Sequence, residues 1–215
     1  MEGEVLPIIV IGGGGHAKVL LNILRRLTIY RVLGFVTPDE TGTLLDFSWL
    51  GNDEQLKEIS ARYRNVAGAI GIGKINANGR RLAVLQRARN AGLLMPPIVA
   101  PTATVAPDVI LGDGTVVFDG AIIQPGCVVG IGSIINNGAI VDHDCTLGDD
   151  VHIAPGASIS GGVTVGNGSM IGVGASCAHG KRIGAACMIG AGSAIVSDCI
   201  DPGTYQGVPA KFVQP

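Results

Sequence analysis

The chain is poor in aromatic residues, poor in charge and without a long apolar run. Only 4% of its 215 residues are aromatic and 15% are charged, although 47% are hydrophobic. The formal net charge of −2 gives no electrostatic reason to expect nucleic acid as a partner. No apolar stretch approaches the roughly 18–20 residues that a membrane-spanning helix needs, and the start MEGEVLPIIV lacks the basic segment of a signal peptide. We therefore expect a soluble, cytoplasmic protein.

Glycine and other small residues take the place of the missing aromatics. The sequence contains 34 glycines, and from Val99 to Ile200 it repeats every six residues without an insertion. The first position is Val, Leu or Ile in every hexad but one, where Cys177 stands, and the fourth is Gly or Asp in fifteen of seventeen. Such a short, fixed period indicates a β-solenoid, in which each coil is buried only by its neighbours. We expect three hexads to complete one three-sided coil.

Five cysteines test this register. Four of them stand at the fifth position of a hexad: Cys127, Cys145, Cys187 and Cys199. Elsewhere this position holds Ala, Ser, Thr or Val, so we expect all five cysteines, Cys177 included, to be buried and reduced, like small apolar side chains. We expect no disulfide framework and no metal site. Lys181 also stands at position five, where a lysine cannot remain unpaired in a core, so a local bulge or an outward side chain is expected there.

The first 98 residues contain no hexads and are predicted to form a separate domain, with residues 99–215 forming the solenoid and a short C-terminal tail. Strands are expected over 6–11, 30–36 and 66–72, and helices over 16–27, 53–63 and 76–91. Asp53 is the expected cap of the second helix. This alternation indicates a small parallel sheet of the Rossmann half-fold type. The predicted fold class is therefore a small α/β Rossmann-like domain followed by a parallel β-helix.

Four consecutive glycines, residues 12–15, follow the first predicted strand and open the first predicted helix. Backbone N–H groups at such a helix N-terminus face an incoming anion. The pattern Gly12-x-Gly14-x-x-Ala17 fits the dinucleotide fingerprint loosely, and the second strand ends at residues 36–38 without an acidic residue at its tip. We therefore expect a diphosphate-containing ligand of mononucleotide size rather than NAD, and a tight turn without a ligand stays the alternative.

Three of the four histidines lie in the solenoid. His143 stands at position three, where the side chain points outward, and Asp144 follows at the turn position. A carboxylate beside an exposed imidazole orients the ring and raises its basicity, although a turn residue alone would also account for Asp144. His179 comes two coils later, roughly 9–10 Å further along the axis. His152 falls on a different face, so it can meet His143 only across a subunit interface. An uninvolved surface histidine stays the alternative for each.

Three groups of residues carry a resemblance to a known family. The hexads close with GVPAK at 207–211, and the N-terminal part contains IGGGGHAKV at 11–19, LGFV at 33–36 and GND at 51–53. With these motifs the whole chain resembles the sugar-nucleotide N-acetyltransferases that acetylate a 4-amino group, including UDP-4-amino-sugar enzymes of the bacillosamine pathway and GDP-perosamine N-acetyltransferase. The resemblance implies a left-handed β-helix, acetyl-CoA as co-substrate, no metal, and a homotrimer with three active sites between subunits.

The resemblance also implies roles for individual residues. His143 matches the general base and Asp144 its acidic partner. Asn136 matches a sugar contact, His152 a contact to acetyl-CoA from the neighbouring subunit, and Gly161 the N–H that faces the thioester carbonyl. Further acetyl-CoA contacts match Gly172, Gly174, Ala178, Pro209 and Lys211. Further sugar-nucleotide contacts match Gly13, Gly14, Gly15, His16, Thr37, Pro38 and Asp39.

The expected reaction is direct acetyl transfer to the 4-amino group of a nucleotide-linked dideoxy amino sugar, with GDP-perosamine favoured and a place in O-antigen biosynthesis implied. A UDP-linked acceptor, a sugar O-acetyltransferase such as one acting on sialic acid, and a non-enzymatic sugar-nucleotide sensor stay open. A zinc hydratase like the γ-class carbonic anhydrases needs three histidines around one metal, and no third histidine lies close after His179.

Overall fold

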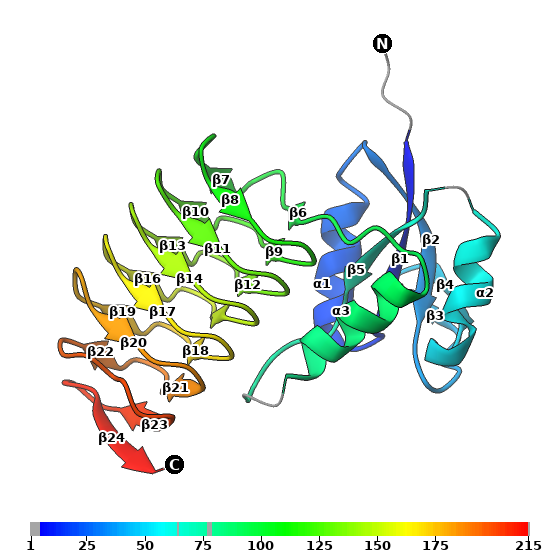
Figure 1. The fold of residues 1–215 in the computed structure, drawn as a ribbon. Coiled ribbons are helices and arrows are strands. Elements are labelled where there is room, and N and C mark those ends of the chain that lie inside the picture. The colour runs from blue at the N-terminus through cyan, green and yellow to red at the C-terminus, as the bar shows by residue number, and fades with distance from the viewer. Residues whose placement is uncertain (1–4, 64, 77–78, 215) are drawn as a thin grey trace.

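The computed structural model describes residues 5–63, 65–76 and 79–214, which form an N-terminal α/β part and a solenoid (Figure 1). The α/β part is built on one sheet with the strand order β3 (Thr43–Leu44), β4 (Phe47–Gly51), β2 (Tyr30–Val36), β1 (Leu6–Ile11) and β5 (Ala67–Ile70). The pairs β1–β2, β1–β5 and β2–β4 are parallel, as the alternation of strands and helices predicts. The short β3 is antiparallel to β4.

The helices lie close to their predicted positions but differ at their ends. They are α1 (Gly15–Leu24), a 3-10 turn (Asp53–Gln55) leading into α2 (Leu56–Ala61), and α3 (Arg80–Asn90). Asp53 is not the cap: the Asn52 side chain accepts from the N–H groups of Glu54 and Gln55, and the Gln55 side chain accepts from the Asn52 N–H. The predicted start of the third helix falls partly on residues 77–78, outside the described residues.

The solenoid has three faces, and each face is a sheet of parallel strands. Each strand pairs with the strand 18 residues further along, as three-hexad coils require. The first face consists of β6 (Ile98–Val99), β9 (Val116–Val117), β12 (Ile134–Ile135), β15 (His152–Ile153), β18 (Met170–Ile171) and β21 (Cys187–Ile189). The second consists of β7 (Thr104–Val105), β10 (Ile122–Ile123), β13 (Ile140–Val141), β16 (Ser158–Ile159), β19 (Ser176–Cys177) and β22 (Ala194–Ile195). The third consists of β8 (Ile110–Leu111), β11 (Val128–Val129), β14 (Thr146–Leu147), β17 (Thr164–Val165) and β20 (Arg182–Ile183).

The interior of the prism is filled as the register predicts. All five cysteines are buried free thiols, and burial raises the pKa of Cys177 to about 12. The prediction of a bulge at Lys181 is wrong, because the Thr164 N–H donates to the Lys181 carbonyl and the ladder continues in register. The Lys181 side chain is half-buried instead.

The last coil departs from the six-residue period. Ile183 pairs with Cys199 and Ile189 with Tyr205, a spacing of 16 residues where the earlier coils use 18. The last hexad, which the sequence predicted to run to Ile200, therefore contains only four residues. Cys199 takes the place of the first residue of the next hexad. The shortened coil places Tyr205 over the end of the core. Two additional strands, β23 (Gly203–Gln206) and the antiparallel β24 (Lys211–Gln214), then close the prism.

The first face of the solenoid is covered by the N-terminal part, with α1 and α3 between the sheet and the prism (Figure 1). Val116, Phe118 and Ile134 on or beside this face share one hydrophobic core with α1 residues such as Leu20. In a three-sided prism, the corner between the second and third faces lies opposite the covered face. Side chains on that corner are therefore remote from the N-terminal sheet of the same chain.

Candidate functional site

The glycine loop after β1 forms one wall of a cavity of about 670 Å³, a size typical of small-molecule sites. Its lining includes every residue predicted to contact the nucleotide except Asp39 and Asn136. A Cβ added at Gly14 or Gly15 would meet nothing within 4 Å, so both positions are open to a ligand. Gly14 caps α1 without a side-chain hydrogen bond, and the first N–H groups of the helix are therefore available to an anion.

Three further residues, which the sequence did not indicate as nucleotide contacts, complete this cavity. Its lining also contains Asp53, Arg80 and Arg87, which come from the 3-10 turn and from α3. Arg87 Nη1 lies 2.7 Å from Asp53 Oδ2. The basic character of the third helix was visible in the sequence, but only the packing of α3 beside the loop brings its cations to the cavity. Arg80 and Arg87 give the cavity a positive side that suits a phosphorylated ligand.

His16 lies at the inner end of the loop and is held neutral. Burial lowers the pKa of His16 to about 3, with smaller contributions from the positive charge of Arg81 and from His152. Its ring centroid lies 5.0 Å from that of Phe118. In the described part of the chain, no hydrogen-bond partner is found for its buried Nε2 atom. His16 thus presents a neutral, unpaired ring nitrogen beside the cavity.

His143 and Asp144 form the pair that the sequence predicts, in the exposed turn between β13 and β14. His143 Nδ1 lies 2.8 Å from Asp144 Oδ2. Since a carboxylate can only accept, Nδ1 carries a proton, and in the neutral ring Nε2 therefore has the free electron pair. This hydrogen bond is the largest cause of a raised His143 pKa. Asp144 has a φ of 58°, so it serves the turn and the imidazole at once.

Gly161 lies directly beside the His143 ring, one coil further along. A Cβ added there would lie 2.5 Å from both Cε1 and Nε2 of His143, so the close approach of the ring requires glycine. Among the residues that the structure describes, no acceptor is found for the Gly161 N–H. The ring centroid of His179 lies 6.2 Å from that of His143, so the expected separation of 9–10 Å is wrong for the rings. They lean together because the intervening coil has no side chain between them.

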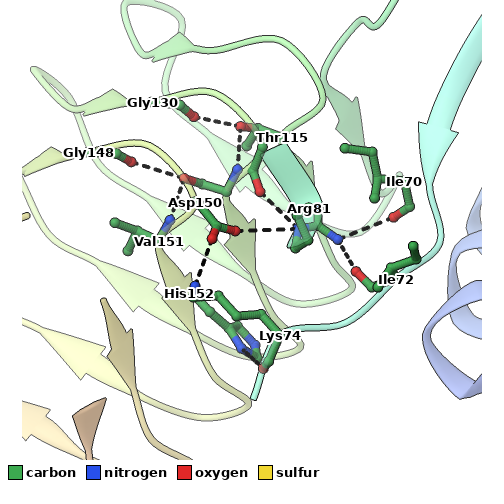
Figure 2. Close-up of polar contacts among 12 residues, drawn as sticks. Ile70, Ile72, Lys74, Arg81, Thr115, Gly130, Gly148, Asp150, Val151 and His152 are labelled. Atoms are coloured by element: carbon green, nitrogen blue, oxygen red, sulfur yellow. Dashed lines mark hydrogen bonds and ion pairs between the residues drawn. The ribbon is translucent and has the colours of Figure 1, made fainter. Parts of the chain in front are cut away.

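His152 is buried in the same chain, so the alternative of a surface histidine is wrong. It is 7% exposed, and its Nδ1 donates to the carbonyl of Lys74 at 2.9 Å (Figure 2). Its Nε2 lies 3.0 Å from Nδ2 of Asn136. A contact with acetyl-CoA would have to use the edge of the ring or replace the Asn136 bond. That contact stays a prediction.

The structure divides the predicted acetyl-CoA residues between two corners of the prism. Gly161 and Ala178 lie in turns between the second and third faces, with His143, whereas Gly172 and Gly174 lie in a turn between the first and second faces, as Asn136 does. Pro209 and Lys211 are exposed near and within β24. One chain does not bring these residues together, and it also places His143 on the corner opposite the face that the N-terminal part covers.

In the described ranges no group of three or more His, Cys, Asp or Glu is placed to hold a metal ion.

Comparisons with known proteins agree with both parts of the fold. Residues 7–85 match the family model of the PglD N-terminal domain, and residues 144–179 match the bacterial transferase hexapeptide family. The acetyltransferase domain of PglB from Neisseria gonorrhoeae FA1090, solved in complex with acetyl coenzyme A, is 35% identical with a TM-score of 0.90, covering 98% of this chain and 100% of that one. No curated protein matches the chain.

Two further solved structures are similar over nearly the whole chain. A mutant of perosamine N-acetyltransferase from Caulobacter crescentus, solved with CoA and GDP-perosamine, is 35% identical with a TM-score of 0.89, covering 100% of this chain and 99% of that one. WeeI from Acinetobacter baumannii AYE is 22% identical with a TM-score of 0.78, covering 97% and 100%, and shares the fold. The predicted fold, a Rossmann-like α/β domain followed by a left-handed β-helix, is confirmed.

Proposed function

Because this chain belongs to the hexapeptide-repeat acetyltransferases that carry a PglD-type N-terminal domain, we propose that it acetylates the 4-amino group of a nucleotide-linked dideoxy amino sugar. The chain is an acyltransferase with acetyl-CoA as co-substrate. GDP-perosamine is the favoured acceptor, since it is bound in the structure of a relative that is 35% identical to this chain and matches it over nearly its whole length. In the described residues no helix is long and apolar enough to cross a membrane. The cytoplasmic location stays a prediction.

The observation that carries the proposal is the exposed His143–Asp144 pair beside Gly161. His143 Nε2 accepts a proton from the sugar amine as the amine nitrogen attacks the thioester carbonyl. The C–N bond forms, the C–S bond breaks, and the imidazolium returns its proton to the departing CoA thiolate. The N–H of Gly161 stabilises the oxyanion that develops on the carbonyl oxygen. A positioned general base is typically worth about 10²–10⁴-fold in rate.

The remaining predicted residues fit two binding regions. The sugar nucleotide occupies the cavity at the glycine loop, with its phosphates at the α1 N-terminus and beside Arg80, and Asn136 contacts the sugar. Acetyl-CoA lies along the solenoid, contacting residues at two corners and in the tail, as proposed for Gly172, Gly174, Ala178, Pro209, Lys211 and His152. Since these corners lie at the two ends of the second face of one prism, we propose a homotrimer in which each site combines two chains.

A sugar O-acetyltransferase is the second candidate, because His143 could equally take a proton from a hydroxyl. A UDP-linked acceptor is the third, because the lining of the cavity does not by itself select a base. Both alternatives share the fold and the general base. They differ from the favoured reaction only in the acceptor.

The proposal is tested by incubating the protein with acetyl-CoA and a set of acceptors and measuring free CoA. GDP- and UDP-linked 4-amino sugars are compared with the matching 4-hydroxy sugars. We expect CoA release with the amino sugars, and a loss of about 10²-fold or more in kcat for His143→Asn. His179→Asn, two coils further along, is the matched control. Release of CoA with the hydroxy sugars alone would show O-acetylation, and a His143→Asn variant with near wild-type kcat would remove the assigned base.

A further inference from the structure

A buried cluster of charges lies between the N-terminal part and the solenoid, apart from the proposed reacting atoms (Figure 2). Lys74 Nζ lies 2.8 Å from Asp150 Oδ2, and both side chains are 3% exposed. Arg81 Nε donates to the Gly132 carbonyl and lies 4.0 Å from Asp150 Oδ1. The guanidinium also donates through Nη1 to the carbonyls of Ile70, the last residue of β5, and of Ile72, just after it. Two cations from the segment after β5 and from α3 therefore meet one carboxylate of the solenoid.

The turn geometry does not explain this carboxylate. Asp150 stands at the fourth hexad position with a φ of 52°, a conformation that glycine adopts at no steric cost and that glycine supplies in most of the other turns. Burying an ion pair removes two charges from water, and the attraction between them offsets this desolvation cost only when the geometry is good. The role of this ion pair therefore lies elsewhere, in the position of the backbone segment that carries Lys74.

The backbone carbonyl of Lys74 helps to determine which ring nitrogen of His152 carries the proton. A carbonyl can only accept, so the 2.9 Å contact between the Lys74 carbonyl and His152 Nδ1 requires a proton on Nδ1. On the other side, Asn136 Nδ2 can only donate, so the 3.0 Å contact with His152 Nε2 requires a free electron pair there. Both contacts select the same tautomer. Burial, the largest cause, lowers the pKa of His152 to about 4, which leaves the ring neutral.

The orientation of the Asn136 amide is fixed independently. The Asn137 N–H donates to Asn136 Oδ1 at 2.8 Å, so this oxygen is the acceptor end and Nδ2 must face His152. A chain of contacts thus runs from the Asp150 carboxylate through Lys74 and His152 to the Asn136 side chain. It joins the edge of the glycine-loop cavity, which Gly73 lines, to the residue proposed to contact the sugar.

We propose that Lys74 and Asp150 are positioning residues for the reaction. Their ion pair holds the segment after β5 so that the Lys74 carbonyl fixes His152 as the neutral Nδ1–H tautomer, and His152 Nε2 in turn fixes the Asn136 amide for the acceptor sugar. The effect on catalysis rests on the proposed function, in which Asn136 contacts the sugar. The tautomer of His152 does not rest on it.

The first test measures the tautomer in the wild-type protein by ¹⁵N NMR of labelled histidine at pH 7. The His152 signals are assigned from their loss in His152→Gln. We expect a protonated Nδ1 and an unprotonated Nε2. A ring protonated at Nε2, or at both nitrogens, would overturn the proposal. This measurement needs no substrate, so it remains decisive even if every nucleotide sugar proves to be the wrong acceptor.

The second test separates positioning from folding. Lys74→Met removes the ammonium and keeps an apolar stem, while Asp150 retains Arg81 as a neighbour. We expect kcat to fall about 10–100-fold, as expected for a misplaced contact group, with the KM for the nucleotide sugar changed by about twofold or less. The His152 signals should become a mixture of tautomers. Lys74→Arg, which keeps a cation beside Asp150, should recover most of kcat.

Lys57→Met is the matched control, since Lys57 is exposed on α2, and it should leave kcat and the His152 signals unchanged. A folded Lys74→Met variant with wild-type kcat and a wild-type tautomer would overturn the proposal. If Lys74→Met does not fold, Lys74→Arg and the wild-type tautomer still decide it. Absence of acetyl transfer by the wild-type protein would count against the proposed function and leave the tautomer result standing.

Discussion

Two aspartates show how residues in the same backbone setting acquire different chemistry. Asp144 and Asp150 both stand at the fourth hexad position with φ values of 58° and 52°. Asp144 bonds an exposed imidazole, whereas Asp150 bonds a buried ammonium from another part of the chain. The first raises the basicity of a candidate general base, and the second fixes a carbonyl beside a buried histidine.

Asp144→Asn should change the pH dependence of the reaction while keeping the turn. Asparagine also adopts the left-handed conformation, and its amide oxygen still accepts the His143 Nδ1–H. Losing the negative charge lowers the raised His143 pKa. The base works only when deprotonated, so the acidic limb of kcat/KM should move to lower pH, and the weaker base should lower the plateau by about tenfold. Profiles from pH 5 to 9 check this, with Asp149→Asn as control. A limb that stays or moves to higher pH would contradict it.

The sequence predicts residue positions that depend on the period alone. The hexad register places the cysteines inside and His143 outside because each needs only its position within one coil. The register did not predict the 6.2 Å between the His143 and His179 rings, which depends on side-chain conformations around Gly161. It also did not predict the burial of His152, because the N-terminal part covers that face and no periodicity within the solenoid encodes the packing of the two parts.

At the scale of elements, we expect the glycine loop and α1 to act together as an anion site. Gly13 lies so close to Thr37 that an added Cβ would stand 2.5 Å from Thr37 Cγ2, whereas Gly14 and Gly15 are open. Gly13 therefore serves the packing of the loop on β2. Gly14 and Gly15 serve access to the helix N-terminus.

Gly15→Pro should weaken nucleotide binding without damaging the helix. Gly15 is the first residue of α1, the position where proline is best tolerated because its missing N–H has no partner within the helix. Gly14 is already extended, as a residue before proline prefers. The KM for the nucleotide sugar should rise about tenfold through the lost N–H contact, with the thermal midpoint unchanged. Gly15→Ala keeps the N–H and serves as control. Equal KM values for the two variants would show that this N–H does not bind phosphate.

Elements with a continuous apolar pattern are predicted best. Strands over 6–11 and 30–36 match β1 and β2 residue for residue. The β3–β4 hairpin was missed because its turn has positive φ at Leu45 and Asp46, where no glycine or asparagine marks it. The short last coil was missed because Cys199 and Ile200 happen to continue the six-residue pattern, although the pairing of β21 with β23 has already shifted by two residues.

In the whole molecule, the proposed nucleotide cavity and the proposed general base lie on opposite sides of the solenoid. The glycine-loop cavity and Asn136 lie at or next to the covered first face, while His143 and Gly161 lie on the corner between the second and third faces. We therefore do not expect a short sugar attached to a nucleotide in the cavity to reach His143 of the same chain. We therefore expect a complete site to combine the proposed nucleotide-binding half of one chain with the proposed general base of another.

This division predicts complementation between two kinds of impaired chain. A His143→Ala chain keeps the cavity, and a Gly15→Pro chain with Asn136→Ala keeps the base, so each homotrimer should have low activity for a different reason. When the two are unfolded together and refolded as a mixture, some interfaces will pair an intact cavity with an intact base. Activity should return to about a tenth or more of the wild-type value. Mixing without unfolding is the control and should restore little. If the jointly refolded mixture stays no more active than its parents while it forms mixed trimers, the site lies within one chain.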